Sequence, residues 1–240
     1  MAVFAHADDE INVSPLLNHY ASLGYKVYLV IATKGELGIR EHVKIPAGDS
    51  LAAARITEAK CVCTVLGIEP PVFLGLGDES LAKDFTGAPL SKKLDSIFAL
   101  YQPDAVITWG PGGGYGHTDH RMVHNIVTEL FQSGRNRWPK QLYYTEIPTE
   151  NLAAMPTLKE GVSRYITSLW KTVKKDYLPT RVSYTNKEMD AAMRSIDCYK
   201  SQFSDGEMED NKTFLKYSNN DTVYLRPYYK EEKRKYDIFE

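Results

Sequence analysis

Five short apolar runs, separated by helical stretches, limit most strongly what this chain can fold into. Near-continuous apolar runs of this length are typical of strands that are covered on both faces of a sheet. The expected strands span residues 2–5, 25–33, 71–76, 104–109 and 141–147. Helical patterns occupy residues 49–67, 91–101 and 118–134. This alternation predicts an α/β fold, with a Rossmann-like, mostly parallel sheet and helices on both faces.

The alternation weakens beyond residue 149. Residues 163–181 are mixed, residues 186–203 look helical, and residues 220–240 are rich in tyrosine and then charged. The charge run near Lys230 is interpreted as a solvated surface. Because no internal repeat or low-complexity linker is found, we expect residues 1–240 to form a single domain, with 150–240 as a less regular C-terminal part packed on it.

Charge and hydropathy exclude several classes of protein. A net charge of -2 and a pI near 6.3 argue against a protein that holds nucleic acid or an anionic membrane surface. No apolar run approaches the roughly 20 residues that a membrane span needs. The first residues also lack the basic start and long apolar stretch of a secretory signal. We therefore expect a cytoplasmic protein. The sequence leaves open whether an export signal has been removed from it.

The cysteines are odd in number: Cys61, Cys63 and Cys198. An odd count gives no self-contained disulfide framework. Cys61 and Cys63 lie two residues apart in a helical stretch, so they face different directions. We interpret all three as small buried hydrophobic residues, which favours a reducing compartment.

Ligands of open parallel sheets bind outside the carboxyl ends of the strands. The loops that follow the first four strands read "HADDE", "KGELGIRE", "GDES" and "GPGGGYGHTDH". Two of them carry histidine beside aspartate. A catalytic zinc takes three ligands from His and Asp/Glu and keeps one position open. His6, an aspartate of the first loop and a histidine of "GHTDH" would supply such a set.

The motifs "AHADDE" and "GYGHTDH" resemble the two signatures of the PIG-L (LmbE-like) zinc-dependent N-acetylglucosamine deacetylases. "TKGELG", "RITE" and "LGLGD" add support, and "AAMRSIDCYKSQF" is similar to a late helix of the family. The resemblance covers most of the first 125 residues. Each motif alone is weak, whereas the pair in this order, each after an expected strand, is specific.

The resemblance implies a Zn²⁺ ion bound by His6, Asp9 and His120, with Asp8 as the general base. One departure is Ala7, where many members have proline. Proline would stiffen the loop, but its side chain performs no chemistry, so the assignment stands.

The resemblance also implies roles around the substrate. His117 would stabilise the oxyanion of the tetrahedral intermediate, and Asp119 would tune His117. Tyr115 matches a mobile tyrosine near the substrate carbonyl. Arg55 and Asp78 match positions associated with substrate contact.

Several of these positions have plainer alternatives. Arg55 could pair with Glu58 on its own helix. Asp78 could form a turn ahead of Ser80. A histidine and two aspartates on one loop are more often a solvated turn than a metal site, and only the second motif reverses that balance. His124 is interpreted as a structural or cleft-wall residue.

The glycine-rich "GPGGGYG" raises a different class of function, a Rossmann-type nucleotide-binding module without hydrolase activity. No start within it gives G-x-G-x-x-G, and no lysine with Ser/Thr follows as in a P-loop. The expected function is therefore a zinc-dependent hydrolase that removes acetyl from an N-acetylglucosamine-type amide of a small molecule. The sequence leaves open which conjugate is cleaved and whether the protein is a homo-oligomer.

Overall fold

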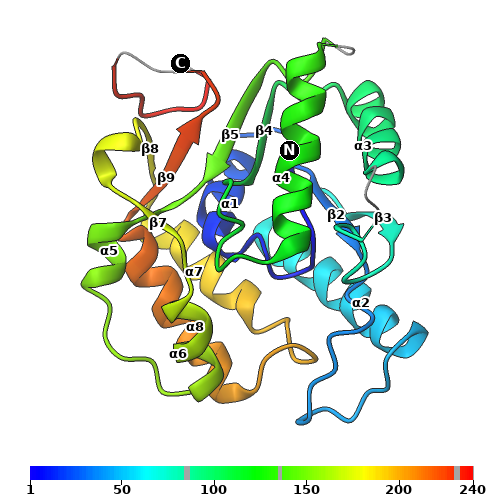
Figure 1. Cartoon of the computed structure of the whole chain (residues 1–240). Coiled ribbons are helices and arrows are strands. Elements are labelled where there is room, and N and C mark those ends of the chain that lie inside the picture. Colours follow the sequence, from blue (N-terminus) through cyan, green and yellow to red (C-terminus); the bar gives the residue numbers. More distant parts are fainter. Residues whose placement is uncertain (84–86, 135–136, 230–232, 240) are drawn as a thin grey trace.

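A seven-stranded sheet with the order β3-β2-β1-β4-β5-β9-β8 forms the centre of the protein (Figure 1). The computed structural model describes residues 1–83, 87–134, 137–229 and 233–239. Strands β3 to β5 of this order pair in parallel, and β9 and β8 pair antiparallel at one edge. The mostly parallel sheet is therefore confirmed. The strands are β1 (Ala2–Phe4), β2 (Leu29–Thr33), β3 (Val72–Leu76), β4 (Ala105–Trp109), β5 (Gln141–Thr145), β8 (Thr180–Ser183) and β9 (Thr222–Pro227).

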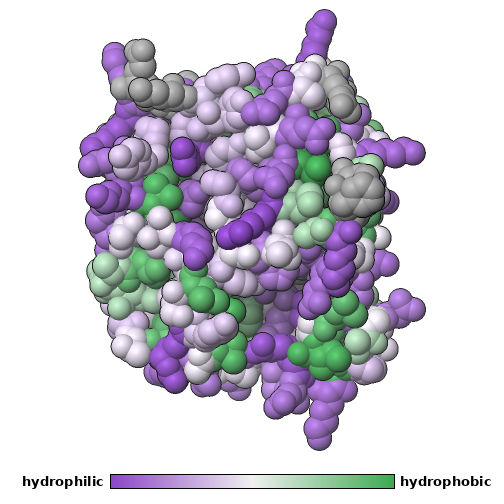
Figure 2. Space-filling view, viewed as in Figure 1, coloured by the Kyte–Doolittle hydropathy of each residue, from purple (hydrophilic) through white to green (hydrophobic). Residues whose placement is uncertain are grey.

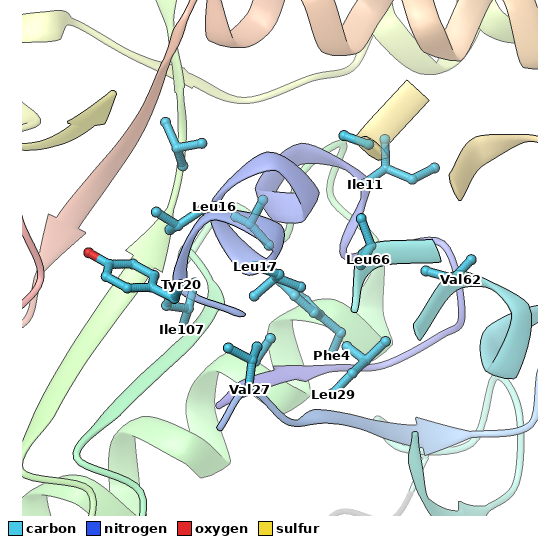
Figure 3. Packing of buried hydrophobic residues seen from close by; sticks show 14 of the residues in the cluster. Phe4, Ile11, Leu16, Leu17, Tyr20, Val27, Leu29, Val62, Leu66 and Ile107 are labelled. Atoms are coloured by element: carbon cyan, nitrogen blue, oxygen red, sulfur yellow. The ribbon is translucent and has the colours of Figure 1, made fainter. Parts of the chain in front are cut away.

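Helices cover both faces of the sheet, as the apolar strands require (Figure 1). Alternate strand residues point to opposite faces, so Phe4 joins one buried cluster and Val3 the other. Figure 3 shows the first cluster, in which Phe4 and Leu29 of the sheet meet Leu17 and Val62 of two covering helices. The α-helices are α1 (Ser14–Ser22), α2 (Asp49–Leu66), α3 (Ala88–Tyr101), α4 (Thr118–Ser133), α5 (Thr149–Ala153), α6 (Gly161–Ser168), α7 (Asn186–Ile196) and α8 (Asp205–Asn219).

The segment beyond residue 149 packs against the same sheet and helices. Strands β8 and β9 extend the sheet next to β5, and α7 packs on α1 and α2. A second, two-stranded sheet joins β6 (Ile147–Pro148) to β7 (Thr172–Val173). The helix expected over residues 186–203 ends at Ile196 and continues as turns. The charge run expected near Lys230 begins at 230–232, which lie outside the described residues.

The prediction that all three cysteines are free and buried is wrong for two of them. Cys61 of α2 and Cys198 form a disulfide that closes a loop of 137 residues, and Cys61 is exposed. Only Cys63 is both free and buried among the three. A disulfide is typical of oxidising compartments, so the cysteines no longer support a cytoplasmic location. Among the described residues, no helix is long and apolar enough to cross a membrane.

Replacing both bonded cysteines, as Cys61→Ser with Cys198→Ser, is expected to lower the free energy of unfolding by roughly 2–4 kcal/mol. The reason is that cross-linking residues far apart in sequence restricts the unfolded chain. Urea unfolding with and without reductant measures the change. Reductant should destabilise the native protein and leave the double variant unaffected. Equal stability of the two proteins without reductant would contradict the prediction.

Candidate active site

The loops after β1 and β4 meet at the point where the strand order of the sheet reverses. From β1 the chain proceeds to β2 and β3 on one side, whereas β5 follows β4 on the other. Chains leaving the carboxyl ends of β1 and β4 diverge there and open a crevice. The first loop carries His6 to Glu10, and the second ends at the start of α4 with His117 and His120.

The carboxylate of Asp9 organises the first loop. Its Oδ2 accepts hydrogen bonds from the backbone N–H of Ala5 at 3.0 Å and of His6 at 2.9 Å. Trp109, the last residue of β4, donates its indole N–H to the same oxygen at 3.1 Å. These three donors occupy Oδ2 and leave Oδ1 directed at His120. Apart from its position at a strand end, Trp109 carries no sequence signal that predicts this contact.

The neighbouring Asp8 is held differently. Its φ of 99° lies in the left-handed region, which a residue with a Cβ rarely adopts. The buried Glu10 accepts the Asp8 backbone N–H at 3.1 Å, and the Tyr199 hydroxyl donates to Glu10 at 2.6 Å. Within the described residues, no hydrogen bond engages the Asp8 carboxylate, which lines the cavity. The two adjacent aspartates thus differ chemically: the Asp9 carboxylate accepts three hydrogen bonds, whereas the Asp8 carboxylate faces the cavity.

Two imidazole rings and Asp9 converge on one point. The distance from His6 Nδ1 to His120 Nε2 is 3.1 Å, and from His120 Nε2 to Asp9 Oδ1 3.0 Å. Zinc bonds of about 2.0–2.1 Å in tetrahedral geometry separate ligand atoms by about 3.3 Å, so these spacings suit a bound metal. The other nitrogen of His120, Nδ1, lies 3.2 Å from the Gly113 carbonyl. A proton on Nδ1 leaves the lone pair of Nε2 free for a cation.

The outer side of His6 faces two more carboxylates. Its Nε2 lies 3.3 Å from Asp78 Oδ1 and 3.6 Å from Asp119 Oδ2. Carboxylates in this position hold the proton on one ring nitrogen and direct the other at the metal. Among the described residues the buried Asp119 Oδ2 has no hydrogen-bond partner, and the His6 ring nitrogen 3.6 Å away is a group that can satisfy it.

Two overlapping sets of donors in the described chain could hold a metal ion. One combines His6, His117 and His120, and the other His6, Asp78 and Asp119, with donor atoms within 4.8 Å of one another. Asp9 contacts the first set through His120 at 3.0 Å.

The second histidine motif makes one contact that differs from the expectation. The link from Asp119 to His117 runs through the backbone: the Asp119 N–H donates to His117 Nδ1 at 3.2 Å. Burial, with the nearby rings of His120 and His6, lowers the pKa of His117 to about 4. His117 is therefore neutral near pH 7, and its Nε2 carries the proton that it can donate.

The surroundings shift the pKa values of Asp8 and Asp9 in opposite directions. It raises the pKa of Asp8 well above its usual value, and the charge of Asp9 adds to that shift. For Asp9 burial acts in the same direction, but His120 and His6 outweigh it and hold the pKa of Asp9 well below its usual value. Burial raises the pKa of Tyr115, which keeps that hydroxyl protonated. The Tyr115 ring lies 5.4 Å from that of His120.

Arg55 and Asp78 both reach the cavity. Arg55 is 7% exposed and donates to the Gly38 carbonyl at 2.7 Å. A Cβ on Gly35 would lie 2.5 Å from its guanidinium, so this glycine lets the loop wrap around the arginine. No ion pair joins Arg55 to Glu58 in the described residues, and Glu58 instead accepts hydrogen bonds from Ser201.

Asp78 combines the turn and the site roles. Its Oδ1 accepts the Glu79 N–H at 3.0 Å and also faces His6, while Oδ2 accepts the Leu37 N–H at 3.1 Å. The Nδ1–H of His124 donates to the Trp109 carbonyl oxygen at 2.8 Å, which suits a structural residue.

One cavity of about 360 Å³ contains these groups, a size typical of ligand pockets. His6, Asp8, Arg55 and His117 line its inner end. Residues that the sequence did not single out line the rest, including Trp170, Gln202 and Phe214. Trp170 and Phe214 come from segments beyond residue 149 without a motif, whereas Gln202 lies within "AAMRSIDCYKSQF".

The sequence matches a known family over its first half. The sequence profile of the PIG-L family, described as GlcNAc-PI de-N-acetylase, matches residues 1–131 of the 240. The chain belongs to the PIG-L family. The two motifs of the candidate site lie inside the matched span, which confirms the family resemblance noted from the sequence.

Curated relatives extend the likeness beyond the PIG-L profile. The 1D-myo-inositol 2-acetamido-2-deoxy-alpha-D-glucopyranoside deacetylase of Mycobacteroides abscessus is 33% identical over 63% of this chain. The match spans 61% of that enzyme, less than two thirds of its length. The enzyme of the same name from Corynebacterium diphtheriae is 35% identical, over 68% of this chain and 63% of its own.

Solved structures share the PIG-L fold of this chain at low identity. The N,N'-diacetylchitobiose deacetylase of Pyrococcus horikoshii has a TM-score of 0.70 and 19% identity, covering 94% of this chain and 82% of that one. The 4-carboxy-2-hydroxymuconate hydratase of Pseudomonas putida has a TM-score of 0.66 and 16% identity, covering 98% of each chain. Since these two proteins differ in chemistry, the fold alone does not select a reaction.

Proposed function

We propose that this chain is a zinc-dependent N-deacetylase that releases acetate and a free amine from an N-acetylglucosamine-type substrate. The observation that carries the proposal is the chemical difference between the adjacent aspartates. Asp9 is fixed by three donors beside two imidazoles, whereas the Asp8 carboxylate opens into the cavity. The deacetylase names of the curated relatives support the same reaction class. We further propose that the 240 residues act as one LmbE-like domain.

The donor set favours a metal held by His6, Asp9 and His120. His120 Nε2 lies 3.1 Å from His6 Nδ1 and 3.0 Å from Asp9 Oδ1, and His6 Nδ1 lies 3.7 Å from Asp9 Oδ2, spacings that bracket those of tetrahedral zinc. The outer nitrogen of each histidine faces an oxygen acceptor. A bound Zn²⁺ would supply Lewis-acid polarisation of the amide carbonyl and make a water more acidic.

The remaining steps belong to the side chains of the chain. Asp8 accepts a proton from the water that attacks the amide carbon, and it is the carboxyl that can return the proton to the departing nitrogen. His117 donates its Nε2 proton to the developing oxyanion, and the protonated Tyr115 hydroxyl offers a second donor. Arg55 and Asp78 line the cavity where hydroxyl groups of the sugar would bind.

The test is stoichiometric release of acetate and amine from a panel of N-acetylglucosamine conjugates, including the methyl glycoside and the inositol conjugate. Zinc-loaded protein should release one acetate for each new amine, and it should carry no nucleotide absorbance when purified. A zinc-loaded, folded protein that releases no acetate from any member of the panel would rule out the proposed reaction. Bound nucleotide without turnover would instead support the nucleotide-binding module.

A further inference from the structure

We propose that the cavity contains an apolar subsite, formed by one side of α6 and by Phe214 of α8, that binds a hydrophobic aglycone attached to the sugar. This inference rests on the proposed deacetylase function and adds the class of conjugate that is cleaved. An N-acetylglucosaminide with an alkyl or aryl aglycone is the matching chemistry.

One side of α6 carries an apolar stripe that is partly exposed. Val162, Ile166 and Trp170 follow at intervals of four residues and therefore lie on one side of α6 and its C-terminal turn. All three line the cavity. Helix α6 has no buried residue, and Val162 is 50% exposed. An amphipathic helix normally buries its apolar side, whereas in the described residues only the Trp170 end of this stripe packs on the core and the Val162 end stays exposed.

The stripe is nevertheless held in place at both ends by α8 (Figure 1). Just before α6, the N–H groups of Lys159 and Glu160 donate to the Asp210 carboxylate at 2.9 and 2.7 Å. Beyond α6, the Trp170 ring lies 4.8 Å from that of Phe214. These contacts fix the position of the apolar surface relative to α8, which lines the same cavity.

Charged groups near the stripe are already satisfied by the protein. Arg40 pairs with Glu207, and Asp210 accepts the two N–H groups before α6. Among the described cavity walls, the buried polar atoms without a partner include Arg55 Nε and Gln202 Nε2, and a single sugar hydroxyl could satisfy the latter. A charged aglycone would therefore find few free charged partners here.

The kind of ligand that would bind follows from the fact that the apolar stripe and the catalytic groups line one continuous cavity. The stripe and the inner groups His6 and Asp8 line the same space. Across the opening, Ile39 of the loop after β2 is 58% exposed and also lines it. Figure 2 shows apolar surface over α6 and again over this loop, with a hollow between them. A ligand with a polar acetamide end and an apolar tail matches both parts of one cavity.

The experiment compares methyl and octyl N-acetylglucosaminide, the latter below its micelle concentration, as substrates of the zinc-loaded protein. The native protein should show a kcat/KM at least about tenfold higher for the octyl glycoside, since full burial of two methylene groups already corresponds to such a factor. The double variant Val162→Asn with Ile166→Asn should bring the ratio close to one and leave the methyl rate unchanged.

A matched control lies on the same helix. Tyr165 is 64% exposed and does not line the cavity, so Tyr165→Asn should keep the octyl preference. The methyl rate reports on folding, and Val162→Ser alone, at a half-exposed position, should lower the ratio if the double variant fails to fold.

The outcomes separate the two proposals. Acetate release from both glycosides at equal kcat/KM overturns the apolar subsite and leaves the deacetylase proposal intact. A preference that survives the double variant in folded protein overturns the assignment to α6. Absence of acetate from either glycoside counts against the reaction, and calorimetric affinities of the two glycosides then decide the subsite, with equal affinities overturning it.

Discussion

The variant Asp8→Asn is expected to keep the fold and the metal and to lose about 10²–10⁴-fold in kcat, the range usually contributed by a general base. The physical reason is that an amide cannot take a proton from water. The Asp8 carboxylate accepts no hydrogen bond in the described residues, so its loss leaves no buried donor unpaired. The Asp8 backbone N–H, which donates to Glu10, is unchanged by the substitution. Acetate release, metal analysis and thermal unfolding measure the three properties.

A matched carboxylate serves as control. Glu79 also lines the cavity but is exposed and has no assigned role, so Glu79→Gln should keep kcat within a few-fold. Near-normal turnover of Asp8→Asn would show that another group takes the proton. Loss of metal from Asp8→Asn would show instead that Asp8 is a ligand.

The sequence predicted the parallel sheet and the edge that carries the site, for a physical reason. Buried strands are short apolar runs, and the carboxyl ends of parallel strands meet at one edge. Loops that are far apart in sequence could therefore be predicted to form one site from the expected parallel sheet alone. The outcome is that Asp9, Asp78 and His120, from three of those loops, lie around His6.

The C-terminal part was less predictable because its elements carry weaker patterns. Helix α8 is largely polar, so periodicity did not reveal it, although Ser204 and Glu207 form a capping box that local reading could have found. The antiparallel strands β8 and β9 follow no strand–helix alternation. The region also supplies Tyr199 and Trp170, whose contacts with the first loop and the cavity arise only from tertiary packing.

The disulfide could not be derived from sequence for a similar reason. Cys61 and Cys198 are separated by 137 residues, and only the packing of α7 on α2 brings them together. Because the free Cys63 makes the number of cysteines odd, the count alone did not indicate that the other two form a disulfide.

The variant Asp9→Asn is expected to lose its metal while keeping its fold. The oxygen of asparagine can still accept the N–H groups of Ala5, His6 and Trp109 that now bind Oδ2. Its NH₂ group then replaces the oxygen 3.0 Å from His120 Nε2 and donates to the lone pair that a metal needs. Metal affinity should fall by more than the roughly 10–100-fold that is typical when a group behind a ligand is removed.

Metal content of protein purified without added metal, followed by zinc titration, measures this effect. The native protein should carry about one zinc per chain, as expected for a site of three ligands with one open position. Excess zinc should restore part of the activity of Asp9→Asn and none of that of Asp8→Asn. Asp78→Asn is an intermediate control, because Asp78 faces the outer nitrogen of His6. The zinc affinity of this variant should lie between those of the native protein and of Asp9→Asn.

The alternative donor set gives the decisive comparison. His117 shares the site with His6 and His120, and its donor atom lies within 4.8 Å of theirs. If Asp9 is the third ligand, His117→Ala retains zinc and loses turnover through the missing oxyanion donor. If His117 is the ligand instead, His117→Ala loses zinc while Asp9→Asn retains it, and the roles of the carboxylate and the imidazole must be exchanged. Because its Nδ1 already accepts the Asp119 N–H, His117 can reach a metal only through Nε2, the nitrogen assigned to the oxyanion.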